Sequence, residues 1–227
     1  MTGFGKRSLI KLNNVSKAFL DKEPLFLNLD ASVTKGEFLF LTGISGAGKS
    51  TLFKLLIGTE LPDEGQVFVN GKLVNEMNPK EMSLHRRKIG VIFQDYKLLQ
   101  QKTAAENIGI PLQIQGISTH MIEDKIQNLA EKMKISHLLS QPIQSLSGGE
   151  QQLVAIARAS IHSPSMILAD EPTANLDQKM ATQILDMLLA LNEEGITIII
   201  ATHDINLIKS HDTRILLIKN STLTEVG

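Results

Sequence analysis

The sequence predicts an α/β protein with a mainly parallel sheet and a helical segment inserted into it. Short apolar runs typical of buried strands recur at 37–42, 88–93, 166–169 and 196–201. Segments with apolar residues at three- and four-residue spacing, which is typical of helices, separate several of these runs. Apolar strands that alternate with helices favour a parallel sheet covered on both faces.

The first third of the chain predicts strands, turns and one helix. The runs at 9–12 and 37–42 are rich in strand-forming residues, and 66–71 alternates between apolar and polar before a turn. The segment 49–58 predicts a helix with three leucines on one face. Gly58 is placed to end that helix, because glycine adopts the left-handed conformation of a helix C-terminus.

The middle of the chain predicts mainly helix, from about 103 to 163. Apolar or small residues recur at helical spacing at Ile122, Ile126, Leu129 and Met133, and again at Leu153, Ile156, Ala157 and Ser160. A strand, helix, strand pattern then resumes over 166–201. We therefore expect one domain, 1–227, with a core at about 1–94 and 164–227 and a helical subdomain at about 95–163.

Composition excludes several classes of function. The chain has 23 basic and 24 acidic residues and a net charge of -1, so it lacks the basic excess of a nucleic-acid binder, and we expect no nucleic-acid partner. Cysteine is absent, which excludes disulfides and thiolate metal sites. No apolar run approaches the roughly 20 residues that cross a bilayer. The charged start at 1–7 is not followed by an apolar signal core. We expect a soluble chain that reaches a membrane through a partner.

A glycine-rich loop predicts nucleotide binding. Residues 43–50 fit the pattern G-x-x-x-x-G-K-[ST], after a predicted strand and before a predicted helix. Glycines let the backbone approach phosphate with its N–H groups turned inward, and the helix start adds a positive dipole end. Lys49 supplies a charge for the β- and γ-phosphates, and the Ser50 hydroxyl is a hard oxygen ligand for Mg²⁺. The alternative is a chance glycine-rich turn, which the flanking strand and helix make rarer.

Two carboxylates end the apolar run at 166–169. Asp170 lies where the carboxyl end of a strand can hold Mg²⁺, usually through water, and Glu171 can polarise an attacking water as a general base. The alternative is a solvated turn, since Asp-Glu-Pro favours turns. The glycine-rich loop upstream favours the catalytic interpretation.

Two other polar residues follow predicted strands. His203 comes after the run at 196–201, where an imidazole could hydrogen-bond a γ-phosphate. Gln94 comes after the run at 88–93 and could reach Mg²⁺ and the water through its carbonyl oxygen. A lone histidine at a strand end is more often structural or exposed, and Gln94 could be a surface amide. The sequence alone leaves both roles open.

A second glycine pair stands at the predicted start of a helix that runs to about His162. Residues 146–150 read Leu-Ser-Gly-Gly-Glu, in which Ser147 and Glu150 form an S-x-x-E capping box. The box does not explain Gly148 and Gly149, because glycine weakens the first turn of a helix. Paired glycines at a helix start suit contact with phosphate. One loop already holds one nucleotide, so a second phosphate contact indicates two chains that face each other.

In this combination and order the motifs resemble the ATP-binding-cassette family, and the resemblance covers nearly the whole chain. The family's order is an aromatic residue near the first strand, a phosphate loop, a Gln loop, a signature, an acid pair, a Leu-Asp loop and a His. The matching residues are Phe19, the loop Gly43, Ile44, Ser45, Gly46, Ala47, Gly48, Lys49, Ser50 and Thr51, then Gln94, the signature 146–150, Asp170, Glu171, the loop 175–177 and His203.

The resemblance implies a P-loop core with an N-terminal antiparallel β subdomain and an inserted helical subdomain. It also implies ATP hydrolysis, with Glu171, His203 and Lys49 as the catalytic residues. Mg²⁺ would be held by Ser50, Gln94 and Asp170.

The resemblance further implies a homodimer that forms on ATP binding. Phe19 would stack on adenine, and Asp177 would couple the two sites of a head-to-tail pair. The signature residues Ser147, Gly148, Gly149 and Glu150 would belong to the nucleotide site, with the first three in contact with the γ-phosphate bound by the opposite chain.

Within the family, the stretches 40–56, 90–95 and 201–207 are similar to bacterial cell-division ATPases. This similarity implies a peripheral location on the cytoplasmic side of the plasma membrane, an integral membrane permease as partner, cytoplasmic division proteins as further partners, and control of cell-wall hydrolysis. Lipoprotein-releasing and macrolide-exporting ATPases share the signature and acid-pair motifs, so transport is an alternative. An ATP-gated scaffold with incidental turnover is another. Apolar residues at 96–116 are candidates for contact with the partner or for the core.

Two positions depart from the family pattern. Leu153 stands where arginine is usual, which puts in doubt a polar contact near the signature helix, and Ala174 replaces a common glycine, which stiffens the loop before Asp177. Neither removes a group from the chemistry. The basic run at 85–88 is expected to be a solvated face, and the alternative is a contact with anionic lipid.

Overall fold

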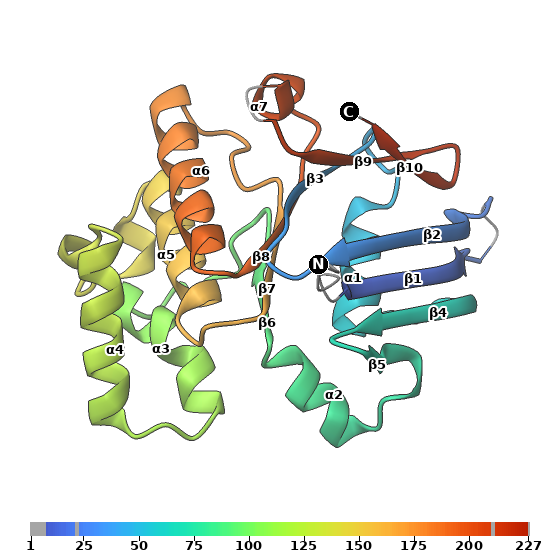
Figure 1. Cartoon of the computed structure of the whole chain (residues 1–227). Coiled ribbons are helices and arrows are strands. Elements are labelled where there is room, and N and C mark those ends of the chain that lie inside the picture. The colour runs from blue at the N-terminus through green and yellow to red at the C-terminus, as the bar shows by residue number, and fades with distance from the viewer. Residues whose placement is uncertain (1–7, 21–22, 210–211, 227) are drawn as a thin grey trace, which may run out of the picture. The chain divides into compact units, whose positions relative to one another are not determined.

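The computed structural model describes residues 8–20, 23–209 and 212–226. The chain groups into two compact units, one of residues 1–86 and 197–227 and the other of residues 87–196 (Figure 1). The charged start at 1–7 lies outside the described residues. The helical subdomain expected at 95–163 falls inside the second unit, and its boundaries stay a prediction. Within the described ranges, no helix is both long enough and apolar enough to cross a membrane.

The first unit contains an antiparallel sheet near the N-terminus, as the family resemblance implies. Its strands are β1 (Ser8–Lys17), β2 (Phe26–Thr34), β4 (Glu64–Val69) and β5 (Lys72–Leu73), in the order β2-β1-β4-β5. β1 pairs with both β2 and β4 (Figure 1). Its apolar residues Leu9, Ile10, Leu12 and Val15 are buried, whereas Lys11 and Asn14 are exposed. One side of this sheet therefore closes the core of the unit.

A second set of strands in this unit is mainly parallel. β3 (Phe38–Thr42) lies between β8 (Thr197–Ala201) and β9 (Arg214–Lys219) and is parallel to both, and β10 (Thr222–Val226) pairs antiparallel with β9. β8 is buried along its whole length and β3 along nearly all of it, as expected of parallel strands covered on both faces. The strands predicted at 37–42 and 196–201 are confirmed to within one residue.

Helix α1 (Lys49–Ile57) confirms the helix predicted at 49–58, and Gly58 ends it with a φ of 73°. Its last carbonyl groups are satisfied by α2 (Pro79–Arg86), which follows the 3-10 turn η1 (Val74–Glu76). His85 Nε2 lies 2.7 Å from the carbonyl oxygen of Leu56, and Arg86 Nη2 donates to that of Gly58 at 2.8 Å. The prediction of a solvated face at 85–88 therefore holds for Arg86, Arg87 and Lys88, which are exposed, and is wrong for His85, which is buried. Arg86 also caps α1 from this exposed position.

The second unit combines two parallel strands with a group of helices. β6 (Ile89–Ile92) pairs in parallel with β7 (Met166–Asp170). The helices are α3 (Ala104–Ile114), α4 (Thr119–Lys132), α5 (Gly148–Ser160) and α6 (Gln178–Glu193), with 3-10 turns η2 (Ser136–Leu138) and η3 (Ile143–Ser145). α3 packs against α4 and α5, and α6 packs against α5 (Figure 1). The short helix α7 (Ile205–Lys209) belongs to the first unit. The predicted α/β class is confirmed.

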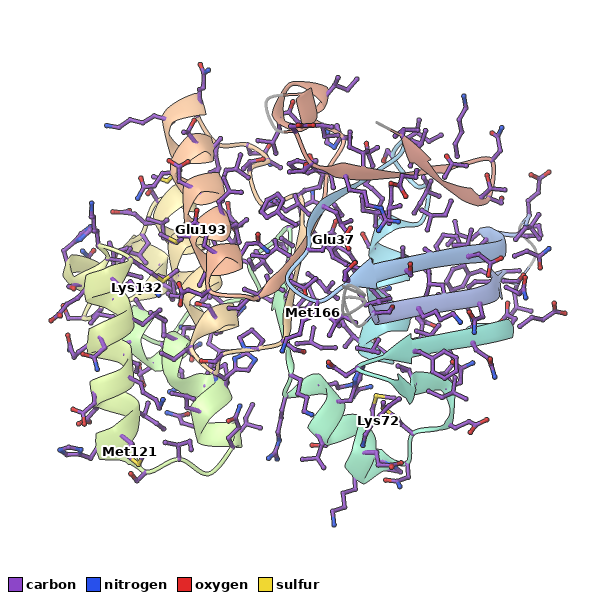
Figure 2. The ribbon with its side chains drawn as sticks, viewed as in Figure 1. Glu37, Lys72, Met121, Lys132, Met166 and Glu193 are labelled. Atoms are coloured by element: carbon purple, nitrogen blue, oxygen red, sulfur yellow. The ribbon has the colours of Figure 1, made fainter. Side chains whose placement is uncertain are left out.

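The apolar residues at 96–116 divide between core and surface. Leu98 and Ile108 are buried, so for these two the core interpretation is correct. Leu99 and Ile114 are exposed, and so is Met121 near the start of α4 (Figure 2). Only the exposed residues remain candidates for contact with a partner.

Candidate functional site

The loop 43–50 has the backbone that a phosphate-binding loop needs. Gly43 and Gly48 have φ values of 154° and 106°, which side-chain-bearing residues rarely adopt. Both also lie against neighbouring strands, since a Cβ on Gly43 would lie 2.7 Å from the carbonyl oxygen of Ile218 in β9. A Cβ on Gly48 would lie 2.5 Å from the ring of Phe26 in β2. The fold therefore requires glycine at both positions.

Lys49 folds back over this loop. The residue is buried, and its ammonium donates to the carbonyl oxygen of Gly43 at 2.9 Å and to that of Ile44 at 3.4 Å. The loop also closes on itself, since the N–H of Ala47 donates to Ile44 at 3.1 Å. The positive charge is thus held at the loop, where the motif predicts that the phosphates bind.

The N-terminus of α1 is built to receive an anion. Its N-cap residue is Gly48, and no side chain caps the helix and no acidic residue stands in its first turn, among the residues the structure describes. By contrast, Thr103, Ser147 and Asp177 cap α3, α5 and α6 with their side chains. Uncapped N–H groups, the helix dipole and the Lys49 ammonium fit the phosphates of a nucleotide. Ser50, which is exposed in the first turn, adds the hydroxyl that suits Mg²⁺.

Phe19 has the partial exposure that stacking on a base requires. Its side chain is 39% exposed, and the Lys17 ammonium lies 5.4 Å from the ring centroid. Lys17 is itself held by an ion pair with Asp63 at 3.0 Å, and Asp63 also accepts from the N–H of Ala18 at 2.7 Å. The segment that carries Phe19 is therefore fixed next to β1. Lys17 and Asp63 were not predicted, because the contact joins residues far apart in the sequence.

His203 follows β8, as the sequence predicts. It is exposed, in the segment between β8 and α7, next to the buried Thr202. The Thr202 hydroxyl accepts from the N–H of Asp204 at 3.1 Å and so shapes this turn. The location of His203 at the carboxyl end of a buried parallel strand is confirmed, and its role stays a prediction.

Asp170 and Glu171 lie in the second unit, where β7 ends. Asp170 is the last residue of the strand, and both carboxylate residues are half-buried. Glu171 has a φ of 47°, the left-handed region that a residue with a side chain enters at a cost of roughly 1–2 kcal/mol. A turn does follow, since the N–H of Ala174 donates to the carbonyl of Glu171 at 3.1 Å. A half-buried acid with a strained backbone is more typical of a functional site than of a solvated turn.

Gln94 is exposed in the turn after β6. The N–H of Tyr96 donates to the carbonyl oxygen of Phe93 at 2.9 Å and closes this turn. Gln94 thus stands at the carboxyl end of a parallel strand, as Asp170 does in the neighbouring strand β7.

The serine of the signature is engaged within its own helix. The Ser147 hydroxyl donates to Glu150 Oε2 at 2.6 Å, the Ser147 N–H donates to the same oxygen at 2.8 Å, and the N–H of Glu150 donates back to the hydroxyl at 3.4 Å. The predicted capping box is therefore present. The hydrogen bonds from the Ser147 hydroxyl and N–H lower the pKa of Glu150. The tip of α5 thus carries an ionised carboxylate at neutral pH.

The two glycines of the signature have packing reasons that the sequence argument missed. A Cβ on Gly149 would lie 2.8 Å from the side chain of Met180 in α6. A Cβ on Gly148 would lie 3.3 Å from the Tyr96 hydroxyl. Packing against Met180 and Tyr96 is therefore a second reason for glycine at these two positions, and the contact with phosphate stays a prediction.

Asp177 caps α6 and is linked through Met180 to the signature glycines. Its Oδ1 accepts from the N–H of Met180 at 2.8 Å, and Met180 packs on Gly149. The loop that ends at Asp177 and the tip of α5 are therefore joined through one side chain. A methionine would not signal such a role in a sequence.

Two neighbouring residues of α5, Gln152 and Leu153, are buried. Leu153 is buried, so the position usually held by arginine here belongs to the apolar core. Gln152 is also buried, and neither atom of its amide has a hydrogen-bond partner in the described part of the chain. The structure offers no account of this unpaired amide.

The predicted site residues divide between the two units. Phe19, the loop 43–51 and His203 belong to the first unit. Gln94, the signature 146–150, the acid pair and Asp177 belong to the second. Each unit therefore contributes one set of groups with chemistry suited to a nucleotide.

Comparison with known proteins identifies the class. The model of the ABC transporter family matches residues 26–174, more than half of the chain, and the chain belongs to this family. It is an ATP-binding and ATP-hydrolysing subunit of the ABC type.

Among curated proteins, the chain is 41% identical over 216 residues to the cell division ATP-binding protein FtsE of Escherichia coli (strain K12). The aligned residues cover 95% of this chain and 97% of that protein. The chain is also 39% identical over 204 residues to the uncharacterized ABC transporter ATP-binding protein YvcR of Bacillus subtilis (strain 168). This alignment covers 87% of this chain and 79% of that protein. Among solved structures, the cassette MJ0796, described as a dimer in a post-hydrolysis state bound to ADP and Pi, has a TM-score of 0.87 and 33% identity, covering 96% of this chain and 98% of that one.

Proposed function

We propose that this chain is the ATPase of an FtsE-type complex, which hydrolyses MgATP as a homodimer and acts in cell division through an FtsX-like membrane partner. The observation that supports the proposal best is the similarity to FtsE over nearly the full length of both chains. The complex would regulate cell-wall hydrolysis.

In the first unit, the residues bind and orient the nucleotide. Lys49, released from the carbonyl of Gly43, would hold the β- and γ-phosphates, while the N–H groups at the start of α1 hold the others. Phe19 would stack on adenine, and the Lys17 ammonium, which lies over the Phe19 ring, would add positive charge there. His203 would hydrogen-bond the γ-phosphate.

In the second unit, the acid pair carries the chemistry. Glu171 would accept a proton from the attacking water, and the strained backbone at this residue supports a functional role. Asp170 and Gln94 of this unit, and Ser50 of the first unit, are the proposed ligands of Mg²⁺, which would supply positive charge for the phosphate oxygens when bound.

In a homodimer, the signature residues of one chain would act on the nucleotide bound by the other. A dimer is the described state of the similar cassette MJ0796. In such a pair Ser147, Gly148 and Gly149 would contact the γ-phosphate bound by the opposite chain, with Glu150 beside them and Asp177 linking the two sites. Loss of the γ-phosphate would remove the bridge and let the chains part.

A membrane partner would turn this opening into work. The exposed side chains of Leu99 and Ile114 are the candidates for its contact. The chain would then be peripheral, on the cytoplasmic side of the plasma membrane, with cytoplasmic division proteins as further partners. A transport role is the second candidate, favoured by the similarity to YvcR.

One experiment tests the partner. The tagged chain is purified from detergent-solubilised membranes of its own host, and co-purifying proteins are identified by mass spectrometry. We expect an FtsX-like protein, whose recovery falls with Leu99→Asp and is unchanged with the exposed Lys80→Ala. Recovery of a substrate-transporting permease instead would contradict the division role and favour transport.

A second experiment separates an engine from an ATP-gated scaffold. Glu171→Gln should retain ATP binding and ATP-dependent dimers but lose turnover. If the biological function survives this substitution, turnover is incidental and the scaffold alternative holds.

A further inference from the structure

Arg158 in the last turn of α5 grips the backbone beyond the Gln94 turn. Its Nη1 donates to the carbonyl oxygen of Lys97 at 2.7 Å, and its Nη2 donates to that of Tyr96 at 2.6 Å. We call these two hydrogen bonds the Arg158 clamp. The rigid fork of a guanidinium suits two neighbouring acceptors, and a single ammonium cannot match that geometry.

The backbone inside the clamp is strained. Tyr96 and Lys97 have φ values of 59° and 48°, so two successive residues with side chains are left-handed. Such residues persist only where their surroundings hold them. The clamp holds both, because each of their carbonyl groups accepts one arm of the same guanidinium.

In the part of the chain that the structure describes, the Arg158 guanidinium has no acidic partner. Among the described residues Arg158 makes no ion pair with a carboxylate, and burial lowers the pKa of its side chain. Asp95, the nearby acid in sequence, pairs instead with Lys97 at 2.6 Å. A charge that is taken out of water and satisfied only by carbonyl groups is costly to place. The hydrogen bonds to the carbonyl groups of Tyr96 and Lys97 are therefore what holds the Arg158 guanidinium in this position.

The Gln94 segment touches α5 at other points too. A Cβ on Gly148, in the first turn of α5, would lie 3.3 Å from the Tyr96 hydroxyl. A Cβ on Gly90 of β6 would lie 2.3 Å from the carbonyl oxygen of Ala159 in the last turn. Strand β6 and the turn after it thus lie against both ends of α5.

We propose that Arg158 is a positioning residue, which couples the Gln94 turn to the signature helix so that Gln94 and the tip Ser147–Gly149 move as one body. The proposal rests on the roles proposed above for these residues. A displacement of the tip when two chains meet would be carried along the rigid helix to Arg158 and so to the turn. Two groups that must act on the same reaction would then be set in place together.

Tyr96 offers a direct probe of the clamp. It is the only tyrosine of the chain, and tryptophan is absent, so its fluorescence can be read without interference. In the nucleotide-free protein, Arg158→Met should raise acrylamide quenching of Tyr96 by about twofold, because the released segment opens more often. Arg86→Met is the matched control, since Arg86 also donates to two carbonyl groups, but to those of Ile57 and Gly58, which belong to the other unit. It should leave the quenching unchanged.

Turnover tests the positioning role. At saturating MgATP, Arg158→Met should lower kcat about tenfold while KM for ATP changes less than about twofold, because the phosphate loop is untouched. Arg158→Lys, which keeps the charge but loses the fork, should fall between this variant and the wild type in both measurements. Should Arg158→Met fail to fold by circular dichroism, the lysine variant decides both questions.

Two results would overturn the proposal. Equal quenching in the wild type and in Arg158→Met excludes the clamp. Raised quenching with unchanged kcat excludes the positioning role and leaves the proposed ATPase function intact. A wild-type chain without ATPase activity would contradict the proposed function, whereas the quenching comparison would still decide whether the clamp exists.

Discussion

The Lys49 ammonium lies 2.9 Å from the carbonyl oxygen of Gly43, at the opposite end of the same loop. The lysine thus spans the phosphate loop, and a γ-phosphate that binds there would replace a neutral acceptor with an anionic one. Because a hydrogen bond to an anionic acceptor is stronger than one to a neutral carbonyl group, we expect the loop to bind nucleotide tightly.

Replacing this lysine should remove most of the affinity for nucleotide. Lys49→Ala is expected to raise the Kd for ATP about 100-fold or more, because it leaves the phosphate charge without its buried partner. Titration with a fluorescent ATP analogue measures the effect. Lys54→Ala, an exposed lysine of the same helix, is the control and should bind normally. Equal affinities in the two variants would contradict the role of Lys49.

Removing the imidazole that caps α1 should destabilise the fold. In His85→Ala the carbonyl oxygen of Leu56 loses a partner inside the protein, which costs about 1–3 kcal/mol. Urea unfolding followed by circular dichroism measures this loss. The exposed neighbour Arg87→Ala should change the free energy of unfolding by no more than about 0.5 kcal/mol. A smaller loss for His85 than for Arg87 would show that the cap does not contribute.

Neutralising the acid at the tip of α5 should strengthen the ATP-dependent dimer. Glu150→Gln keeps the capping box, which glutamine also forms, but removes the negative charge beside the expected γ-phosphate. In a Glu171→Gln background with MgATP, sedimentation velocity should show dimers at lower protein concentration. Weaker dimerisation after this change would show that the carboxylate is not repelling phosphate.

The stability of the first unit should depend on pH through Glu37. Burial raises the pKa of its carboxyl, but the N–H of Thr34 at 2.6 Å and the Arg214 guanidinium at 2.9 Å outweigh this and lower the pKa. A lowered pKa means that its stabilisation is present above the ordinary glutamate pKa and is lost as the pH falls through the lowered value.

Glu37→Gln tests this dependence. The variant should be less stable than the wild type at about pH 7, and the difference should shrink towards about pH 4 and below. Urea midpoints across this range measure it. Glu64→Gln, at an exposed position of the same unit, should show no such convergence. A difference between wild type and Glu37→Gln that stays constant with pH would contradict the assignment.

Much of the fold follows from local patterns in the sequence. The apolar runs at 37–42 and 196–201 became β3 and β8, because a strand buried on both faces needs uninterrupted apolar residues. The helix at 49–58 and its end at Gly58 followed from periodicity and from the left-handed freedom of glycine. The Ser147–Glu150 box was also local, since both residues lie within one turn.

Contacts between distant segments were beyond such reasoning. The burial of His85 within the otherwise exposed run at 85–88 was not predicted, because nothing nearby in the sequence shows that the end of α1 lies beside it. The packing of Met180 on Gly149 and the clamp from Arg158 were hidden for the same reason. Arg158 did leave one signal, a single charge within the apolar stretch 153–159 of the helix.

The sequence by itself determined the chemistry, because a phosphate loop, an acid pair and a glycine-led helix start need fixed residue types at fixed spacing along the chain. The tertiary structure alone decided which side chains hold these motifs in place, since such contacts join residues that lie tens of positions or more apart in the sequence. That is why Lys49 could be assigned from the motif, while the hold of Arg158 on Tyr96 had to be seen in the folded chain.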